Sequence, residues 1–151
     1  MQQYAIYALA EMKKKLMMDK KEFVVLARCR EKLVLIRDQQ RDLWVLPSGQ
    51  KEKGDRTQEE AARRLVGAVL GEATFDVSLL CGYGVTGEGG KERGGYCYLA
   101  DVRSWTEDRG RACAFERLPD ASQLADAPLV AGLKRWAESF FGEAPDGDSL
   151  V

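Results

Sequence analysis

The chain has 151 residues, of which 45% are hydrophobic and 31% charged, and this predicts one globular domain with a real core over residues 1–151. Its 23 basic and 24 acidic side chains nearly cancel, so no overall field draws the protein to nucleic acid or to an anionic membrane. Histidine is absent, which removes the side chain most often used as an acid or base near neutral pH. We therefore expect a small, locally charged ligand, and chemistry based on carboxylates, Lys, Cys, Tyr or an oxygen-ligated metal.

The N-terminal segment lacks the features of an export signal. Its lysines follow the apolar residues and Glu11 interrupts the apolar run, whereas a secretory signal has its charges first. No apolar stretch approaches the length of a transmembrane helix. The four cysteines are widely spaced and form no C-x-x-C pair, which predicts reduced thiols in or near the core. We expect a cytoplasmic protein with no membrane partner.

The first half of the chain predicts three strands. Residues 22–28 and 32–38 are short runs rich in β-branched side chains, and the three residues between them are typical of a hairpin. Residues 43–47 predict a third strand that ends at Pro47.

A helix is predicted to follow these strands. Thr57 and Glu60 match the capping box, in which a hydroxyl and a carboxylate accept hydrogen bonds from free backbone N–H groups at a helix start. The helix should run from about residue 58 to about residue 70. Gly67 lies inside this range and costs about 1 kcal/mol relative to alanine, so a helix that ends near Val66 is an alternative.

The second half of the chain predicts more strands and a second helix. Residues 73–85 and 95–105 read as two long strands, and the loop 86–94 between them is rich in glycine and charge. Residues 112–118 are a further strand candidate. Apolar side chains at helical spacing then predict a helix within residues 126–142: Leu129, Leu133, Trp136 and Phe140.

No repeat, linker or shift in composition divides the chain, and residues 143–151 read as a polar tail. The order of strands, helix, strands and helix predicts an α+β fold in which a mixed sheet lies between helices.

Residues 46–71, LPSGQKEKGDRTQEEAARRLVGAVLG, resemble the Nudix box, whose signature is G-x5-E-x7-R-E-U-x-E-E-x-G-U with U a bulky apolar residue. The matching positions are Gly49, Asp55, Arg63 and Leu65. The resemblance implies a Nudix (MutT-like) fold, a mixed β-sheet with a smaller sheet sandwiched between α-helices. It also implies a cleft for nucleotides and related diphosphates.

The departures from the signature fall on the residues that carry the family's chemistry. Arg64, Gly67 and Ala68 stand where the signature has glutamates, and Leu70 replaces the closing glycine. In the enzymes that the box resembles, those glutamates hold Mg²⁺, a hard cation that takes carboxylate and water oxygens. The replacements change the local charge by four units, so the resemblance implies that the ordinary metal site is missing.

Four acids remain near the box: Glu52, Asp55, Glu59 and Glu60. They are the candidates for a rearranged site that binds Mg²⁺ or Mn²⁺, with Asp55, Glu59 and Glu60 as catalytic candidates. The alternative is that acids at the start of a helix only stabilise its N-terminus.

Arg63 and Arg64 have expected partners in the same segment. By the resemblance, Arg63 pairs with Glu52 or Asp55 and holds the loop, whereas Arg64 is expected to pair with Glu60 one turn earlier. Gly67 has two interpretations: it allows a ligand or a second chain to approach the backbone, or it records drift after catalysis was lost.

Candidates for ligand contact lie outside the box. Lys91 and Arg93, at the tip of the long hairpin, are candidates for phosphate contact, and Tyr83 and Trp44 are candidates for stacking on a base. The alternatives are a solvated hairpin tip and aromatic side chains that pack in the core.

Three functions follow. The first is a non-catalytic or very weak Nudix-like module that binds a nucleotide or another phosphate-containing ligand. The second is a metal-dependent hydrolase of nucleoside diphosphate-linked compounds that uses the remaining acids. The third is a structural or homodimeric protein without a small ligand, with Gly67 and Ala68 on its contact surface.

Overall fold

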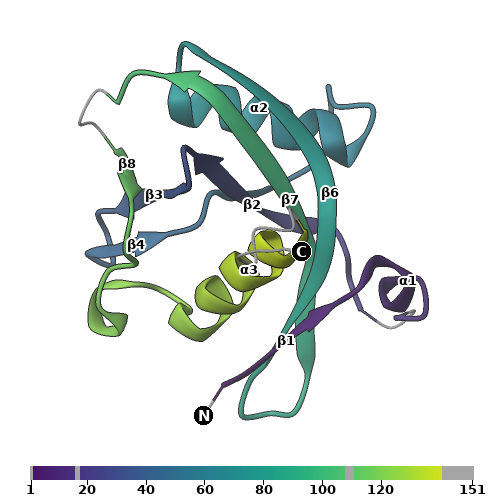
Figure 1. The fold of residues 1–151 in the computed structure, drawn as a ribbon. Helices are drawn as coiled ribbons and strands as arrows, with labels where there is room; N and C mark the ends of the chain where they lie inside the picture. The colour runs from purple at the N-terminus through teal and green to yellow at the C-terminus, as the bar shows by residue number, and fades with distance from the viewer. Residues whose placement is uncertain (1, 16–17, 108–110, 141–151) are drawn as a thin grey trace, which may run out of the picture.

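The computed structural model describes residues 2–15, 18–107 and 111–140 and forms a mixed α+β fold (Figure 1). The expected tail at 143–151 lies outside the described residues. The elements in chain order are β1 (Gln3–Tyr7), α1 (Leu9–Met12), β2 (Glu22–Cys29), β3 (Lys32–Asp38), β4 (Leu43–Val45), β5 (Ser48–Gln50), α2 (Gln58–Leu70), β6 (Ala73–Thr86), β7 (Glu92–Trp105), β8 (Ala112–Phe115), the 3-10 helix η1 (Ala121–Gln123) and α3 (Ala127–Phe140).

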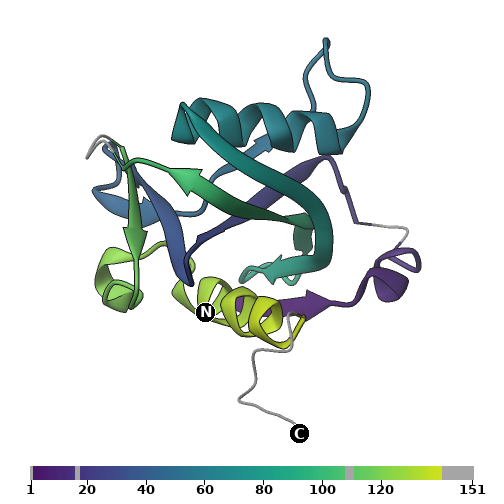
Figure 2. The ribbon, with the colours of Figure 1, turned by 45° about the horizontal axis from the view of Figure 1, so that its top comes forward.

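One mixed sheet connects all the strands. Its main path runs β1-β6-β7-β2-β3-β4, and the pairing is antiparallel except between β2 and β7. The short strands β5 and β8 pair with β2 and β3 as branches of this sheet rather than forming a separate smaller one. Helices α2 and α3 lie on opposite faces of the sheet, as Figure 2 shows.

The core divides into two clusters because successive strand residues point to opposite faces of the sheet. Phe23 and Val25 of β2 pack in the cluster that contains the buried residues of α2, whereas Val24 and Leu26 pack with those of α3. The pattern of β2 therefore reads as a continuous apolar run, as expected for a strand covered on both faces.

Helix α2 begins at a side-chain cap and ends at a glycine. The hydroxyl oxygen of Thr57 accepts a hydrogen bond from the backbone N–H of Glu60 at 3.1 Å, which confirms half of the expected capping box. The Glu60 carboxylate instead accepts from the N–H of Arg56 at 3.2 Å. Gly71, at φ 73°, follows Leu70, so the alternative end near Val66 is wrong.

The other predicted elements are confirmed with shifted ends. The third strand ends at Val45, and Pro47 instead offers its carbonyl oxygen to the N–H of Val25 at 2.9 Å. The hairpin loop is shorter than expected because β6 reaches Thr86 and β7 starts at Glu92. Strands β1 and β5 and helix α1 were not predicted.

The four cysteines carry free thiols, with Cys29, Cys81 and Cys97 buried and Cys113 partly exposed. A hydrogen bond with Cys81, together with burial, raises the pKa of the Cys97 thiol. Within the described residues, no helix is long and apolar enough to cross a membrane.

Candidate functional site

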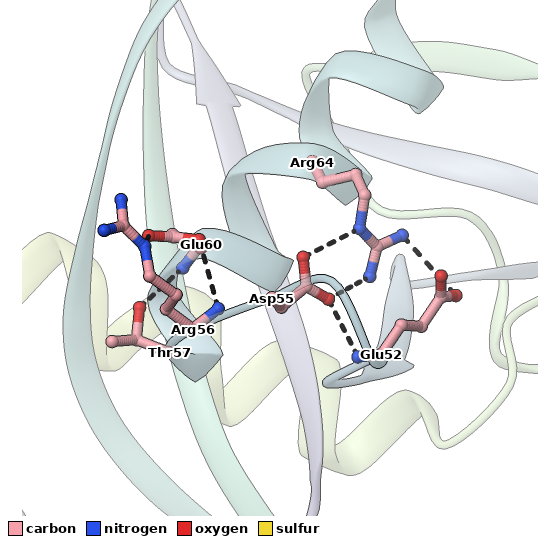
Figure 3. A network of polar contacts seen from close by, with 6 residues as sticks. All are labelled: Glu52, Asp55, Arg56, Thr57, Glu60 and Arg64. Atoms are coloured by element: carbon pink, nitrogen blue, oxygen red, sulfur yellow. Dashed lines mark hydrogen bonds and ion pairs between the residues drawn. The ribbon is translucent and has the colours of Figure 1, made fainter.

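The loop before α2 is held to the helix by Arg64 (Figure 3). Its guanidinium donates to both carboxylate oxygens of Asp55, at 3.2 and 2.8 Å, and lies 3.6 Å from the carboxylate of Glu52. Asp55 also accepts from the backbone N–H of Glu52 at 2.8 Å. Glu52 and Asp55, the two acids nearest the start of the box, therefore both face the guanidinium of Arg64.

The hydrogen bonds from Arg64, followed by the bond from the N–H of Glu52, hold the pKa of the Asp55 carboxyl below its usual range. A bidentate contact of this kind is stronger and more directional than an ordinary surface pair. The side chain of Asp55 is 9% exposed and that of Arg64 is 44% exposed. The carboxylate is therefore largely shielded from solvent, whereas the guanidinium is partly exposed.

The expected partners of Arg63 and Arg64 are wrong. Arg63 pairs with Glu59 at 3.2 Å and donates to the carbonyl of Val77 on β6 at 3.4 Å. Successive helix residues are rotated by about 100°, so Arg63 faces β6 whereas Arg64 faces the loop. Arg64 therefore takes the loop-holding contact that was expected of its neighbour.

The four acids named as metal candidates do not converge. Glu60 pairs with Arg56 at 3.2 Å and Glu59 with Arg63, while Glu52 and Asp55 surround Arg64. In the described part of the chain, no group of three or more acidic, cysteine or histidine side chains is arranged to hold a metal ion. Arginine charge thus occupies the oxygens that a hard cation needs.

Loss of the Asp55–Arg64 contact should make the protein less sensitive to acid. A folded-state pKa below the unfolded value of about 3.9 contributes stability above pH 4, and this contribution is lost as the pH falls through the folded pKa. Urea unfolding at pH 6 and pH 2.5 should show a smaller loss for Asp55→Asn than for the wild type. Asp101→Asn, at an exposed position on β7, controls for removal of one carboxylate, and an equal loss in all three proteins would contradict the assignment.

The face of α2 that carries Gly67 and Ala68 is open. Ala68 is exposed, and apart from the helix's own nearby backbone no atom of the described residues lies within 4 Å of where a Cβ of Gly67 would stand. No contact among the described residues therefore requires a glycine here.

Gly67→Ala should stabilise the protein by about 1 kcal/mol, because alanine has the higher helix propensity and meets no neighbour. Gly71→Ala is the matched control: at φ 73° a side chain is strained, so the same substitution should destabilise. Urea midpoints of the three proteins measure both effects. Destabilisation by Gly67→Ala would mean that a side chain at this position is not accommodated, which would contradict the open face described above.

A cavity of about 690 Å³ lies mainly on the face of the sheet that α3 covers. Its apolar wall and its charged lining come from different elements. The wall includes Val24, Leu46, Val85, Leu129 and Val130, and the charged residues are Glu22, Arg37, Asp38, Arg41, Arg93, Arg111 and Asp126. Of the four positions that match the signature, Gly49, Asp55, Arg63 and Leu65, only Gly49 is among the described lining residues, so the cavity and the altered face of α2 are separate surfaces joined by β5.

Two of the four candidates for ligand contact line the cavity. Tyr83 is a wall residue, 3% exposed, whose hydroxyl donates to Glu22 at 2.8 Å, and burial, then Glu22, raises its pKa. Arg93 also lines the cavity and lies 3.5 Å from Glu22. Lys91 is not among the lining residues, nor is Trp44, whose ring packs against Phe115 at 4.8 Å between centroids.

The sequence did not predict that other charged residues, such as Arg37, Arg111 and Asp126, would line the cavity. Arg37 is the penultimate residue of β3, Arg111 directly precedes β8 and Asp126 directly precedes α3. Each reads as an ordinary charged residue at the end of an element, and only the pairing of distant strands brings them to one cavity.

No protein-family model matches the sequence, and no curated protein matches it significantly. Several solved structures are similar to this chain. A mutant of the Bacillus subtilis pyrophosphohydrolase BsRppH has a TM-score of 0.63 at 19% identity, over 95% of this chain and 91% of that one. A Nudix hydrolase from Nitrosomonas europaea has a TM-score of 0.60 at 18% identity, over 81% and 90%. The Nudix domain of Shewanella oneidensis NrtR, in complex with ADP-ribose, has a TM-score of 0.58 at 16% identity, over 89% and 99%. With its mixed sheet between helices and a loop that follows β5 and leads into α2, the chain has the Nudix fold.

Proposed function

We propose that this protein binds a nucleotide or another phosphate-containing small molecule in its cavity and does not hydrolyse it by the ordinary metal-dependent route. The observation that carries the proposal is the contact of Arg64 with Asp55 and Glu52. It places a positive charge where a metal-binding face would need carboxylates free to coordinate a cation.

The cavity supports the binding half of the proposal. Sites for small molecules in proteins enclose roughly 300–1,000 Å³ and combine an apolar lining with a few placed polar groups. This cavity, at about 690 Å³, has both. Four arginines against three carboxylates line it, which favours an anionic ligand. A domain of the same fold is found with ADP-ribose, so a nucleotide diphosphate is a reasonable first ligand.

The residues near the box do not fit a bound Mg²⁺ or Mn²⁺ in their present arrangement. A divalent ion needs several oxygen ligands at once, and the acids that face the loop are bonded to arginine. No step of a reaction is therefore assigned to a metal. We further propose a cytoplasmic location, where thiols such as these stay reduced.

Isothermal titration with ADP-ribose and ADP tests the proposal, once in EDTA and once with Mg²⁺. The expected result is binding with similar affinity in both conditions. A natively folded protein that binds neither compound, nor any member of a wider panel of nucleotides and nucleotide sugars, would refute it.

A further inference from the structure

Two arginines stand directly opposite each other at the rim of the cavity. The backbone N–H of Arg37 donates to the carbonyl of Arg111 at 2.9 Å, continuing the antiparallel register of Ile36 with Ala112. Both arginines line the cavity, so their side chains project to the same side. Like charges directly opposite on neighbouring strands are destabilising, and this pair requires a reason.

The local carboxylates do not balance the charge. Arg37 pairs with Asp42, whose side chain is 85% exposed, and Arg41 pairs with Asp38 at 2.8 Å. In the described residues Arg111 has no ion-pair partner. Arg37, Arg41 and Arg111 thus share two nearby carboxylates, Asp42 and Asp38, each of which already pairs with one arginine.

The aromatic ring of Trp44 also holds the side chain of Arg37 in place. Trp44 lies opposite it on β4, and the guanidinium sits 5.3 Å from the centre of the indole. A cation over an aromatic ring loses little of its capacity to donate hydrogen bonds at its edge. Trp44 therefore acts as a platform for an arginine rather than for a base.

The opposite side of the cavity is balanced. There Glu22, from the start of β2, lies 3.5 Å from Arg93 of β7 and accepts from Tyr83 of β6. The strands β6, β7 and β2 are neighbours in the sheet, and β3 comes next after β2. Glu22, Tyr83 and Arg93 therefore lie on other strands of the cavity wall than Arg37. Asp126, the remaining carboxylate of the lining, accepts a hydrogen bond from Tyr4 of β1 at 2.9 Å. The surplus of positive charge therefore lies on the side of β3 and β8.

We propose that Arg37 and Arg111, with Arg41 beside them, bind a phosphate group of the ligand without a divalent cation. The inference rests on the proposed function, because it takes the cavity as the ligand site. Arginine forks donate two parallel hydrogen bonds to phosphate oxygens, and a dianion between the two guanidinium groups removes their repulsion. Recognition of the charge thus lies at the β3–β8 rim, away from the altered face of α2.

Titrations of inorganic pyrophosphate and of ADP, in EDTA and low salt, test this inference. Arg111→Gln should weaken the binding of both at least about tenfold, as expected for loss of a charge-assisted contact. Arg135→Gln removes the same charge from an exposed position of α3 outside the cavity and should bind as the wild type does. Arg41→Gln should give an intermediate loss. Without ligand, Arg111→Gln should melt at the wild-type temperature or above it, because a repulsion has been removed.

The possible failures are distinguishable. If the wild type binds neither pyrophosphate nor any nucleotide, the proposed function fails and this inference falls with it. If the wild type binds and Arg111→Gln binds equally well, or if Arg135→Gln loses as much, the inference alone is wrong. Tighter binding of ADP than of pyrophosphate identifies a nucleotide as the source of the phosphate, and equal binding identifies the free anion; both outcomes support the site if they depend on Arg111.

Discussion

The combined substitution Arg64→Glu, Gly67→Glu and Ala68→Glu is expected to create affinity for Mn²⁺ or Mg²⁺ on α2. It changes the charge of this face by four units, releases Asp55 and Glu52 from Arg64 and supplies three carboxylates at helical spacing. Such oxygens are the ligands that these ions prefer. Metal affinity should rise at least about tenfold, or ~1.4 kcal/mol, measured by calorimetry or by Mn²⁺ electron paramagnetic resonance.

The matched control is Arg64→Gln alone, which frees the two loop acids but adds no ligand. It should bind metal far more weakly than the triple variant. Circular dichroism must first show that the triple variant is folded, since the new carboxylates repel one another without a cation. A folded triple variant with wild-type metal affinity would mean that the altered positions are not what prevents binding.

Gly95→Ala is expected to destabilise the protein by about 3 kcal/mol, the upper range for forcing atoms into a packed interior. A Cβ at this position would stand 2.0 Å from the backbone oxygen of Glu22. That oxygen belongs to the start of β2, beside β7 in the sheet, and a backbone atom cannot move aside as a flexible side chain does. Because Glu22 lines the cavity, ligand binding should weaken as well.

Gly89→Ala is the control for this substitution. It lies in the hairpin loop without a left-handed backbone, and no atom of the described residues beyond its chain neighbours lies within 4 Å of a Cβ built there. The substitution should therefore be nearly neutral. Urea unfolding followed by tryptophan fluorescence measures both. Equal stability of Gly95→Ala and the wild type would show that β2 and β7 do not approach as closely as the structure places them.

The sequence predicted the elements whose signals are local. The hairpin of β2 and β3, the start of α2 at Thr57 and the apolar stripe of α3 follow from alternation, capping and helical spacing, and all are confirmed. The box residues Gly49, Asp55, Arg63 and Leu65 predicted the Nudix fold, and similar solved structures confirm that fold.

The parts that were missed depend on contacts between distant segments. Strand β1 is short and exists because it pairs with the end of β6. Arg37 and Arg111 meet only through the pairing of β3 with β8. The choice between Arg63 and Arg64 as the partner of Asp55 was decided by the rotation of one residue around α2, which the box alone does not specify.

Phosphate release tests the central claim most directly. The folded protein is incubated with nucleoside triphosphates, dinucleotides and nucleotide sugars in Mg²⁺ or Mn²⁺, and release is measured directly and with added phosphatase. The predicted result is no turnover above background from preparations that still bind ADP. Turnover that Glu60→Gln abolishes would contradict the account, because it would show that the remaining acids form a working metal site.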